Sequence, residues 1–572
     1  MSDAEKIDEV AKRRGFFFQS SKAYGGVSGF YTFGPEGAEV KQKIEDAWRT
    51  RFSLKEGHRE IEAPTIMPEP VFEASGHLDG FDDMIIECPE CGKNSRADHL
   101  VEDNTEVEEA EGFSTEKIAE IIAEKELVCP ACGEELEGVE VNDFNLMFET
   151  SIGPGDSQPG YLRPETAQGI FVEFPRLKEY ARGQLPFGIT QIGKAYRNEI
   201  SPRNALVRVR EFTQAELELF IDPDEDEPEL EKVEDVELEL YPVEEQGGGE
   251  HLEMTVREAV EEEVIESDWV AYYLGLAKPW FEKVGVDMER FRFRQHNEGE
   301  RAHYATDCWD AEAEIDGDWI ELAGFAYRGC YDLKKHGEHS QDEFTVFRQY
   351  DEPKEVVEET VSPDMGFLGP EYGDTAGRIA EELEHLAKEE PKRFDSDPVE
   401  VEVNEETYEV PLEKTGFERE EVEKPGEHIT PHVVEPSFGI GRVVYTSLAH
   451  SLEEDEVEGE ERSVLRLPYE VAPTEVAVMP MMDKDGMGEK ARKLASELRE
   501  EGFAVSFDAS GSVGKRYRRQ DEVGTPVCVT VDYETLEDGT VTLRDRDTTE
   551  QVRVHSSELS AEIGDFVEER GL

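Results

Sequence analysis

The chain has 572 residues, of which 37% are hydrophobic, so it is long enough for roughly two to four domains with a buried core. Its 137 acidic and 60 basic residues give a net charge of −77, for which disorder is one explanation. The acids lie within segments of clear apolar periodicity, which favours a folded protein of a saline cytoplasm over a disordered chain. The sequence begins without a basic-then-apolar leader and contains no long apolar run, so we expect neither a secretory signal nor a membrane span.

The N-terminal segment is predicted to pack around the core. A helix over about 4–14 precedes a glycine-rich loop and a second helix, in which Val40, Ile44 and Trp48 recur at helical spacing. A strand is predicted over 59–67.

Two matched cysteine pairs predict a metal site. Cys88-Pro-Glu-Cys91-Gly and Cys129-Pro-Ala-Cys132-Gly each present two thiolates on one turn, and the recurrence of proline and glycine in register argues against unrelated cysteines. Four thiolates leave no open coordination position, so we expect structural rather than catalytic zinc. The spacer contains a predicted helix after Ser114. The remaining cysteines are isolated, and we expect them to be small buried apolar residues rather than disulfide partners: Cys308, Cys330 and Cys528.

A hairpin over 187–220 carries the strongest chemical signal. Two alternating strands flank a polar loop at 198–204, and several charged or aromatic side chains share one face: Arg197, Glu199, Arg208, Arg210, Phe212, Glu216 and Glu218. Guanidinium groups make paired, charge-assisted hydrogen bonds to phosphates, a carboxylate accepts from an exocyclic amine, and an aromatic ring offers a stacking face. The pattern predicts a nucleotide-triphosphate site, although a solvated hairpin with alternating charges explains the hairpin equally well by itself.

Two segments are strongly acidic. Residues 222–245 are predicted to form a solvated face with an exposed strand at 233–240. Residues 351–430 are predicted to contain a helix near Ile379 and a hairpin at 399–412.

The composition changes at about residue 469. Strands at 474–479 and 527–531 flank a helix at 489–499, a βαβ pattern that predicts a separate domain. The most basic run of the chain follows, with Tyr517 inside it, and suits RNA phosphates and base stacking: Lys515, Arg516, Arg518 and Arg519. The alternative is a helix whose charges pair with nearby acids.

Three stretches resemble, in order, motifs 1, 2 and 3 of class II aminoacyl-tRNA synthetases. These are Pro64 within 57–66, Arg197-Asn-Glu with the later Arg-Glu-Phe, and Glu435-Pro-Ser-Phe-Gly-Ile-Gly-Arg442. The residues at 21–26, 163–171 and 188–199 are similar in sequence to the dimeric glycyl-tRNA synthetase family. The resemblance covers nearly the whole chain apart from the acidic insertions.

This resemblance implies an α+β fold: a class II antiparallel sheet flanked by helices, with a zinc-knuckle insertion and a C-terminal α/β anticodon-binding domain. The implied divisions are a catalytic domain at 1–87 and 143–468 with acidic insertions at about 222–260 and 351–430, the zinc-knuckle insertion at 88–142, and the anticodon-binding domain at 469–572. It further implies a cytoplasmic homodimer, through Pro64, that binds tRNA(Gly) and not DNA.

The implied activity is ATP- and Mg²⁺-dependent activation of glycine and its transfer to the 3′ end of tRNA(Gly). The implied catalytic residues are Arg197, Glu199 and Arg442. The implied ATP-binding residues are Arg197, Asn198, Glu199, Val207, Arg208, Val209, Arg210, Glu211, Phe212, Glu321, Leu322, Gly439, Ile440, Gly441 and Arg442. The implied glycine-binding residues are Arg96, Glu165, Phe212, Thr213, Gln214, Ala215, Glu216, Glu435, Pro436, Ser437, Phe438 and Gly439.

Two alternatives remain open from the sequence. One is a class II synthetase for another amino acid. The sequence around Glu165, which resembles the glycine-specific family, argues against it. The other is a non-catalytic, synthetase-like subunit that binds nucleic acid. Such relatives lose the ATP-binding arginines, whereas Arg197 and Arg442 are present here.

Overall fold

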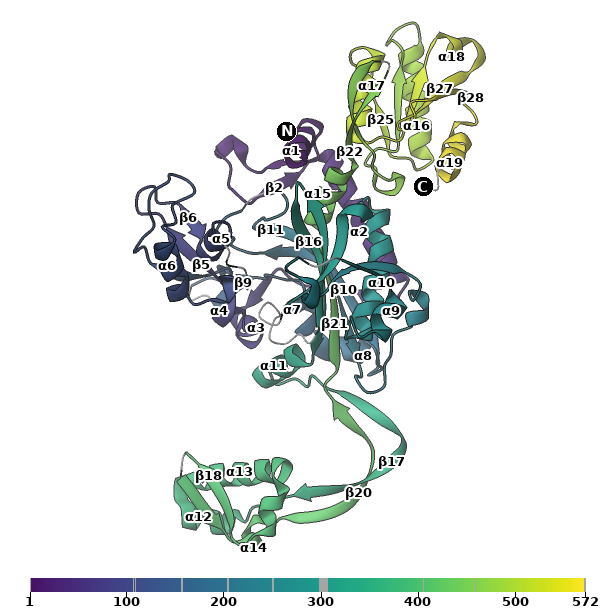
Figure 1. The fold of residues 1–572 in the computed structure, drawn as a ribbon. Coiled ribbons are helices and arrows are strands. Elements are labelled where there is room, and N and C mark those ends of the chain that lie inside the picture. Colours follow the sequence, from purple (N-terminus) through teal and green to yellow (C-terminus); the bar gives the residue numbers. More distant parts are fainter. Residues whose placement is uncertain are drawn as a thin grey trace. The chain divides into compact units, whose positions relative to one another are not determined.

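The computed structural model describes residues 2–105, 107, 110–155, 158–202, 205–248, 251–297, 307–404, 406–457 and 459–569. The chain divides into two compact units, one formed by Met1–Phe344 with Thr430–Leu572 and the other by Thr345–Ile429 (Figure 1).

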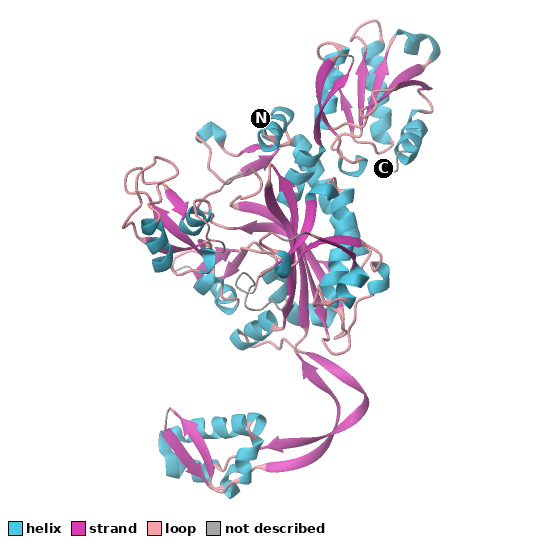
Figure 2. Ribbon diagram, viewed as in Figure 1, coloured by secondary structure: helices cyan, strands magenta, loops and turns pink. Residues whose placement is uncertain are grey.

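A nine-stranded sheet forms the centre of the first unit (Figure 2). Its neighbours run antiparallel except for the β12–β14 and β10–β3 pairs, so the predicted class II antiparallel sheet is confirmed. In spatial order the strands are β13 (Leu252–Thr255), β12 (Glu237–Tyr241), β14 (Phe291–Gln295), β15 (Asp307–Ile315), β16 (Asp318–Gly329), β21 (His432–Gly439), β11 (Glu211–Ile221), β10 (Phe187–Tyr196) and β3 (Arg59–Glu60).

The predicted hairpin is the β10–β11 pair, in register from Phe187 opposite Phe220 to Tyr196 opposite Glu211. Successive side chains on a strand point to opposite faces, so Leu217 and Leu219 enter the hydrophobic core while Glu216 and Glu218 face the other way. Because both faces of β11 are covered, these two glutamates are buried as well.

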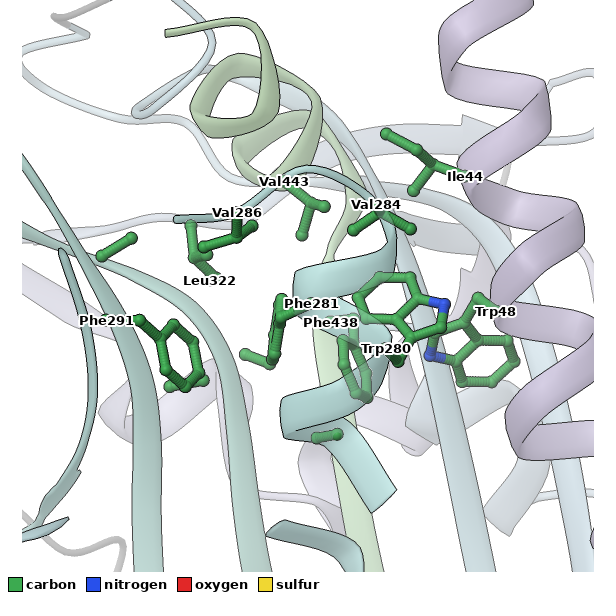
Figure 3. Packing of buried hydrophobic residues seen from close by; sticks show 14 of the residues in the cluster. Ile44, Trp48, Trp280, Phe281, Val284, Val286, Phe291, Leu322, Phe438 and Val443 are labelled. Atoms are coloured by element: carbon green, nitrogen blue, oxygen red, sulfur yellow. The ribbon is translucent and has the colours of Figure 1, made fainter. Parts of the chain in front are cut away.

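Helices α2 (Pro35–Trp48), α10 (Asp268–Lys283) and α15 (Ile440–Ser451) pack on the apolar face of the sheet. Figure 3 shows Trp48 and Trp280 beside Phe438 of β21, with ring centroids 5.9 and 5.2 Å from that of Phe438. Aromatic side chains bury large apolar areas, so this cluster anchors the strand that carries the motif 3 residues.

Two sequence expectations differ from this arrangement. The strand expected over 59–67 is interrupted: β3 and β4 (Ile66–Pro68) are separate, and Pro64 between them has no amide N–H for a ladder. The strand expected to be exposed in the first acidic segment is β12, which belongs to the central sheet, and its Leu238 and Leu240 are buried because α10 packs on its apolar face. Glu237 and Glu239, which alternate with these leucines, are two of the many acids in that segment.

The cysteine-bearing insertion is a small sheet with helices. Strands β6 (Asn94–Arg96), β5 (Asp82–Glu87) and β7 (Val141–Asn145) pair in that order, with α5 (Ala97–Glu102) and α6 (Thr115–Glu124) beside them. The helix expected after Ser114 is confirmed, because Ser114 caps α6 by accepting from the Lys117 amide N–H. Ile118, Ile121 and Ile122 form its buried face.

Smaller elements connect these parts. In chain order they are α1 (Asp3–Arg14), β1 (Phe17–Gln19), β2 (Tyr31–Phe33), α3 (Glu69–Ala74), α4 (His77–Gly80), β8 (Phe148–Ile152), β9 (Gln158–Leu162), α7 (Ala167–Phe171), α8 (Phe174–Tyr180), α9 (Val256–Glu261), α11 (Tyr331–His339), β22 (Leu452–Val457) and β23 (Glu460–Leu465).

The C-terminal part contains a five-stranded sheet. The order is β25 (Val505–Phe507), β24 (Val476–Pro480), β26 (Val527–Val531), β27 (Thr540–Asp545) and β28 (Gln551–His555), with β24 parallel to both of its neighbours. The helices are α16 (Met487–Glu500), α17 (Val513–Val523), α18 (Tyr533–Asp538) and α19 (Leu559–Glu569), so the predicted βαβ pattern is confirmed.

The second unit has its own core. Strands β17 (Val346–Thr360) and β20 (Glu418–Ile429) form a long antiparallel pair. The remaining elements are α12 (Met365–Tyr372), α13 (Ala376–Glu389), α14 (Leu412–Thr415) and the hairpin of β18 (Val399–Val403) with β19 (Glu406–Val410). The helix predicted near Ile379 and the hairpin predicted at 399–412 are confirmed, with Ile379, Leu383 and Val401 fully buried.

Candidate active site

A cleft of about 610 Å³, including its open mouth, lies on the polar face of the central sheet. Many of the residues implied by the motif 2 and motif 3 resemblances line it together: Arg197, Glu199, Val207, Arg208, Val209, Phe212, Thr213, Gln214, Glu321, Ser437, Gly439, Gly441 and Arg442. Leu206 lines it as well. The structure therefore brings segments about 230 residues apart to one cavity.

Arg197 is held at one wall of the cleft by stacking. Its guanidinium carbon lies 5.5 Å from the ring centroid of Phe212 and 5.4 Å from that of Phe81. Its Nε donates to the carbonyl oxygen of Pro164 at 3.3 Å. These contacts fix the guanidinium plane and leave the remaining N–H groups for an anion.

Arg442 is anchored where α15 begins. Its Nε donates to the carbonyl oxygen of Val207 at 3.0 Å, and its Nη1 lies 2.9 Å from the Glu321 carboxylate. The Arg442 guanidinium lowers the pKa of Glu321 against the opposing effect of burial. Glu321 is therefore ionised at neutral pH, and its carboxylate is available at the edge of the cleft.

Glu199 and Arg208 form an ion pair across the hairpin loop, with Nε 2.8 Å from Oε2. Arg210 faces away from the cleft, because its guanidinium donates to the carbonyl oxygens of Glu199 and Ser28. Residues 203–204 of the predicted loop lie outside the described residues.

Several implied residues lie on the opposite side of the sheet from the cleft. Strand alternation directs the side chains of Ala215, Leu322 and Phe438 into the hydrophobic core, and Ile440 enters the same core from the start of α15. Asn198, Glu211 and Pro436 belong to the same segments but do not line the cavity.

A buried acidic pocket adjoins the cleft at Ser437. Glu216 accepts hydrogen bonds from the Ser437 hydroxyl at 2.7 Å and from the Thr166 hydroxyl. Burial raises the pKa of Glu216. Glu165 accepts from Gln168 Nε2 at 2.9 Å and lies 3.8 Å from His77 Nε2, and the nearby cations lower its pKa although burial opposes them.

Arg328 is the principal site residue that sequence reasoning missed. It is 3% exposed, pairs with both oxygens of Asp332 at 3.0 Å, and also donates to Glu435. Burial raises the pKa of Glu435 to about 8 in spite of this partner. The sequence did contain a signal for this pair: Arg328 and Asp332 lie four residues apart in an otherwise apolar stretch. Charged residues are seldom buried without a partner, so the two could have been predicted to pair.

Arg96, expected to contact substrate, does not line the cleft. It is 7% exposed, with its Nη1 3.1 Å from Asp83 and its Nε 3.0 Å from Asp98. Burial raises the pKa of Asp83 to about 6, and Glu199 and Arg208 also act on it. Arg96 therefore binds two aspartates of the insertion, and one of them, Asp83, is close enough to Glu199 and Arg208 for their charges to act on it.

The four paired cysteines converge. Their sulfur atoms lie within 4.8 Å of one another, with Cys88 Sγ 3.6 Å from Cys132 Sγ and Cys91 Sγ 3.8 Å from Cys129 Sγ. Tetrahedral zinc with Zn–S bonds of about 2.3 Å spaces its sulfurs about 3.8 Å apart, so the donor set and its spacing fit zinc.

Cys308, expected to be isolated, is not. Its sulfur lies within 4.8 Å of donor atoms of His296 and Asp310, and these two side chains pair at 2.7 Å.

The basic run lies on α17, and most of its charges pair within the fold. Arg516 is 2% exposed and donates to the carbonyl oxygens of Gly511 and Pro480. Arg519 pairs with Asp508, and Arg518 lies 3.8 Å from Asp521. Arg516, Arg518 and Arg519 thus have partners within the fold, Arg518 and Arg519 remain partly exposed, and Lys515 is exposed.

Comparisons with known proteins agree with this geometry. The model of the class II tRNA synthetase core domain (G, H, P, S and T) matches residues 155–259, and that of the anticodon binding domain matches residues 475–565. A glycine–tRNA ligase of Methanothrix thermoacetophila is 49% identical over 569 residues, covering 99% of this chain and 97% of its own. One from Methanothermobacter thermautotrophicus is 47% identical, covering 97% of each chain.

A solved structure shares the fold. Prolyl-tRNA synthetase from Cryptosporidium parvum, complexed with L-proline and AMP, superposes with a TM-score of 0.52 at 13% identity, covering 98% of this chain and 75% of that one. At such low identity the likeness concerns the fold alone. No helix within the described ranges is long and apolar enough to cross a membrane.

Proposed function

The chain belongs to the glycine–tRNA ligase family of class II aminoacyl-tRNA synthetases, and from this premise we propose that its cleft joins glycine to ATP and passes the glycyl group to tRNA(Gly). The observation that carries the proposal is the junction at Ser437. This residue lines the arginine-rich cleft and also hydrogen-bonds Glu216 of the buried acidic pocket. A nucleotide site and an ammonium site therefore meet within the reach of one small amino acid.

The cleft residues suit ATP in a definite way. Phe212 and Arg442 stack on the two sides of the adenine, and Glu199 accepts from its exocyclic amine. Arg208 binds the triphosphate, and its release from the Glu199 pair makes both groups available when ATP arrives. Arg197 binds the α-phosphate and the glycine carboxylate, since a planar fork contacts two oxygens at once.

The pocket residues suit glycine. Glu165, Glu216 and Ser437 accept from the ammonium group, and the nearby Arg328–Glu435 pair closes the space in which a larger side chain would lie. Selection among small amino acids must rely on exclusion, because a single added methyl contact would favour alanine by about 1 kcal/mol.

Two metals fit the residues that are present. Glu321 offers carboxylate oxygen at the edge of the cleft, which is the ligand that Mg²⁺ prefers beside phosphate oxygens. Cys88, Cys91, Cys129 and Cys132 would hold structural zinc. Bound Mg²⁺ would offset the charge of the triphosphate, and zinc would stabilise the insertion.

Activation then proceeds by positioning. A glycine carboxylate oxygen attacks the α-phosphorus, the bond to the bridging oxygen breaks, and pyrophosphate leaves. A hydroxyl at the tRNA 3′ end next attacks the glycyl carbonyl carbon, and AMP leaves. Arg197 stabilises the charge on the phosphate, and no side chain becomes covalently attached.

Residues 1–87 and 143–468 form the catalytic domain, 88–142 the zinc-knuckle insertion and 469–572 the anticodon-binding domain, with acidic insertions at about 222–260 and 351–430. The protein acts in the cytoplasm as a homodimer whose interface includes Pro64. Lys515 contacts the tRNA, and the charge of −77 adapts the surface to high salt.

Amino-acid-dependent exchange of pyrophosphate into ATP tests the proposal. At high salt we expect exchange with glycine and little with alanine, serine or proline, and loss of exchange in Arg197→Ala and Arg442→Ala. Exchange driven by another amino acid would identify a different class II synthetase. Exchange with none, together with tRNA binding, would identify a non-catalytic subunit.

A further inference from the structure

Glu218 of β11 is a buried carboxyl group whose oxygens have no hydrogen-bond partner among the described residues. Its side chain is 0% exposed and lies two residues from Glu216, on the same face of the sheet. An ionised carboxylate in this position would lose its hydration without gaining a donor, which is strongly unfavourable. Glu218 therefore needs either a proton or a cationic partner.

Acids outnumber bases around Glu218. Glu216 of the same strand, Glu435 of β21 and Asp332 of α11 act on it together with the guanidinium of Arg328 of β16. Two histidines and a further carboxylate border the same network: His77, His336 and Glu165. Burial lowers the pKa of both histidines, so they add no positive charge near neutral pH. The pocket thus carries excess negative charge unless it takes up protons.

The spacing of the carboxyl groups fits an ammonium group. One oxygen from each of Glu216, Glu218 and Glu435 lies within 4.8 Å of the others. Two oxygens that accept from one tetrahedral nitrogen at about 2.8 Å are about 4.6 Å apart. An ammonium group that contacts Glu216 therefore lies within reach of Glu218, the carboxyl group that otherwise has no donor among the described residues, and can share an N–H with it.

We propose that Glu218 carries a proton in the free protein and releases it to solvent when the ammonium group of the amino-acid substrate takes its place, which makes Glu218 a further specificity-determining residue. The exchange is balanced. The O–H bond of the carboxyl group breaks, the proton passes to water, and an N–H of the ammonium group donates to the carboxylate that remains. The inference rests on the proposed function, because it takes this pocket as the amino-group site.

The electrostatics of the pocket support the exchange. Burial and then Glu435 raise the pKa of Glu218 well above its usual range, and burial raises the pKa of Glu435 to about 8. Both shifts favour the protonated form, so a ligand that needs the ionised form of Glu218 must displace its proton. Exchange of one proton makes the affinity for glycine rise about tenfold per pH unit below the pKa and level off above it.

The exchange also favours a cationic amino group over neutral groups of similar size. Glycolate has a hydroxyl group where glycine has its ammonium group. That hydroxyl is neutral, so it provides no positive charge to balance an ionised Glu218. We therefore expect glycolate to leave the proton on Glu218 and to bind weakly.

Titration calorimetry of the full chain with glycine, in buffers of different ionisation enthalpy, counts the protons released per ligand bound. Near neutral pH Glu218→Gln should release about one proton fewer per glycine bound than the wild type, and glycolate should not cause this release from either protein. Glu218→Gln should bind glycine at least about tenfold more weakly at roughly pH 8 and with little pH dependence, because an amide cannot become an anion.

Glu36→Gln is the matched control, since Glu36 on α2 is a partly buried carboxyl group whose pKa burial raises and which lies outside the pocket. It should behave as the wild type. Glycine binding by the wild type without proton release would overturn the inference, and this measurement needs no variant to fold. Unchanged release from Glu218→Gln would also overturn it, by placing the proton elsewhere. Failure to bind glycine, with binding of another amino acid, would instead count against the proposed function.

Discussion

The Ser437 hydroxyl donates a hydrogen bond of 2.7 Å to Glu216, and this contact joins β21 to β11 where the nucleotide cleft meets the acidic pocket. Both residues are on the polar face of the sheet and directly opposite each other in the strand register. Their separation is therefore set by the backbone ladder and not by flexible side chains, which suits a site that must exclude a single methyl group.

Glu216→Gln should weaken glycine binding selectively. Loss of one charge-assisted contact costs about 1.5–3 kcal/mol, which corresponds to a rise of about 10- to 150-fold in the KM for glycine. The KM for ATP should change little, because the cleft residues that contact ATP remain. Pyrophosphate exchange at varied glycine and ATP concentrations measures both values. An unchanged KM for glycine would show that Glu216 does not hold the amino group.

The cysteine cluster should bind one zinc ion per chain. Metal analysis of the purified protein should give a zinc-to-protein ratio near one, falling in Cys88→Ser together with the stability of the insertion. Cys330→Ser is the control, because Cys330 lies outside the cluster and should leave the ratio unchanged. A zinc-free wild type that folds normally would contradict the assignment.

Two residues of the basic run should behave differently. Arg516→Ala leaves the buried carbonyl oxygen of Pro480 and the more exposed one of Gly511 without their donor and should lower the free energy of unfolding by about 1–3 kcal/mol. Lys515→Ala should leave stability unchanged and reduce tRNA charging while glycine-dependent exchange persists. Thermal unfolding and charging assays on both variants separate the two effects. Normal charging by Lys515→Ala would remove that residue from the tRNA interface.

Folding should depend on salt. The self-repulsion of a charge of −77 is screened over about 3 Å at 1 M salt, and the screening length exceeds roughly 4 Å below about 0.5 M. We therefore expect the midpoint of thermal unfolding to fall steadily as KCl is diluted, with loss of structure in dilute buffer. Thermal scans at graded KCl concentrations test this, and full stability at low salt would contradict a high-salt adaptation.

Acid should destabilise the fold through His336. Burial lowers its pKa from 6.5 to about 4, and its Nε2 lies 3.0 Å from Gln168 Oε1. Because the folded pKa is below the unfolded one, this contribution is complete above about pH 6.5 and is lost as pH falls toward 4. The loss approaches about 3 kcal/mol. Unfolding of wild type and His336→Gln across this range should show a steeper decline in the wild type, and parallel declines would exclude His336 as the cause.

Local patterns in the sequence were sufficient for much of this protein. The two cysteine turns, the β10–β11 hairpin, the helix capped by Ser114 and the βαβ order of the C-terminal part all follow from short-range chemistry, since neighbouring residues set turns, caps and side-chain alternation. The resemblance to the class II motifs likewise implied most residues that line the cleft.

The tertiary structure decided which faces of the strands are buried, which the alternation of apolar and polar residues does not show. A period of two shows which residues share a face of a strand, but not whether another element covers that face. Packing of neighbouring strands and helices buried Leu238 in the main sheet, joined Arg328 to Glu435 across two strands, and enclosed Arg516. It also left Glu218 as a carboxyl group without a donor. A charged residue in a sequence is expected to be exposed to solvent. Whether it is buried depends on partners that can lie more than a hundred positions away, as Glu435 does from Arg328.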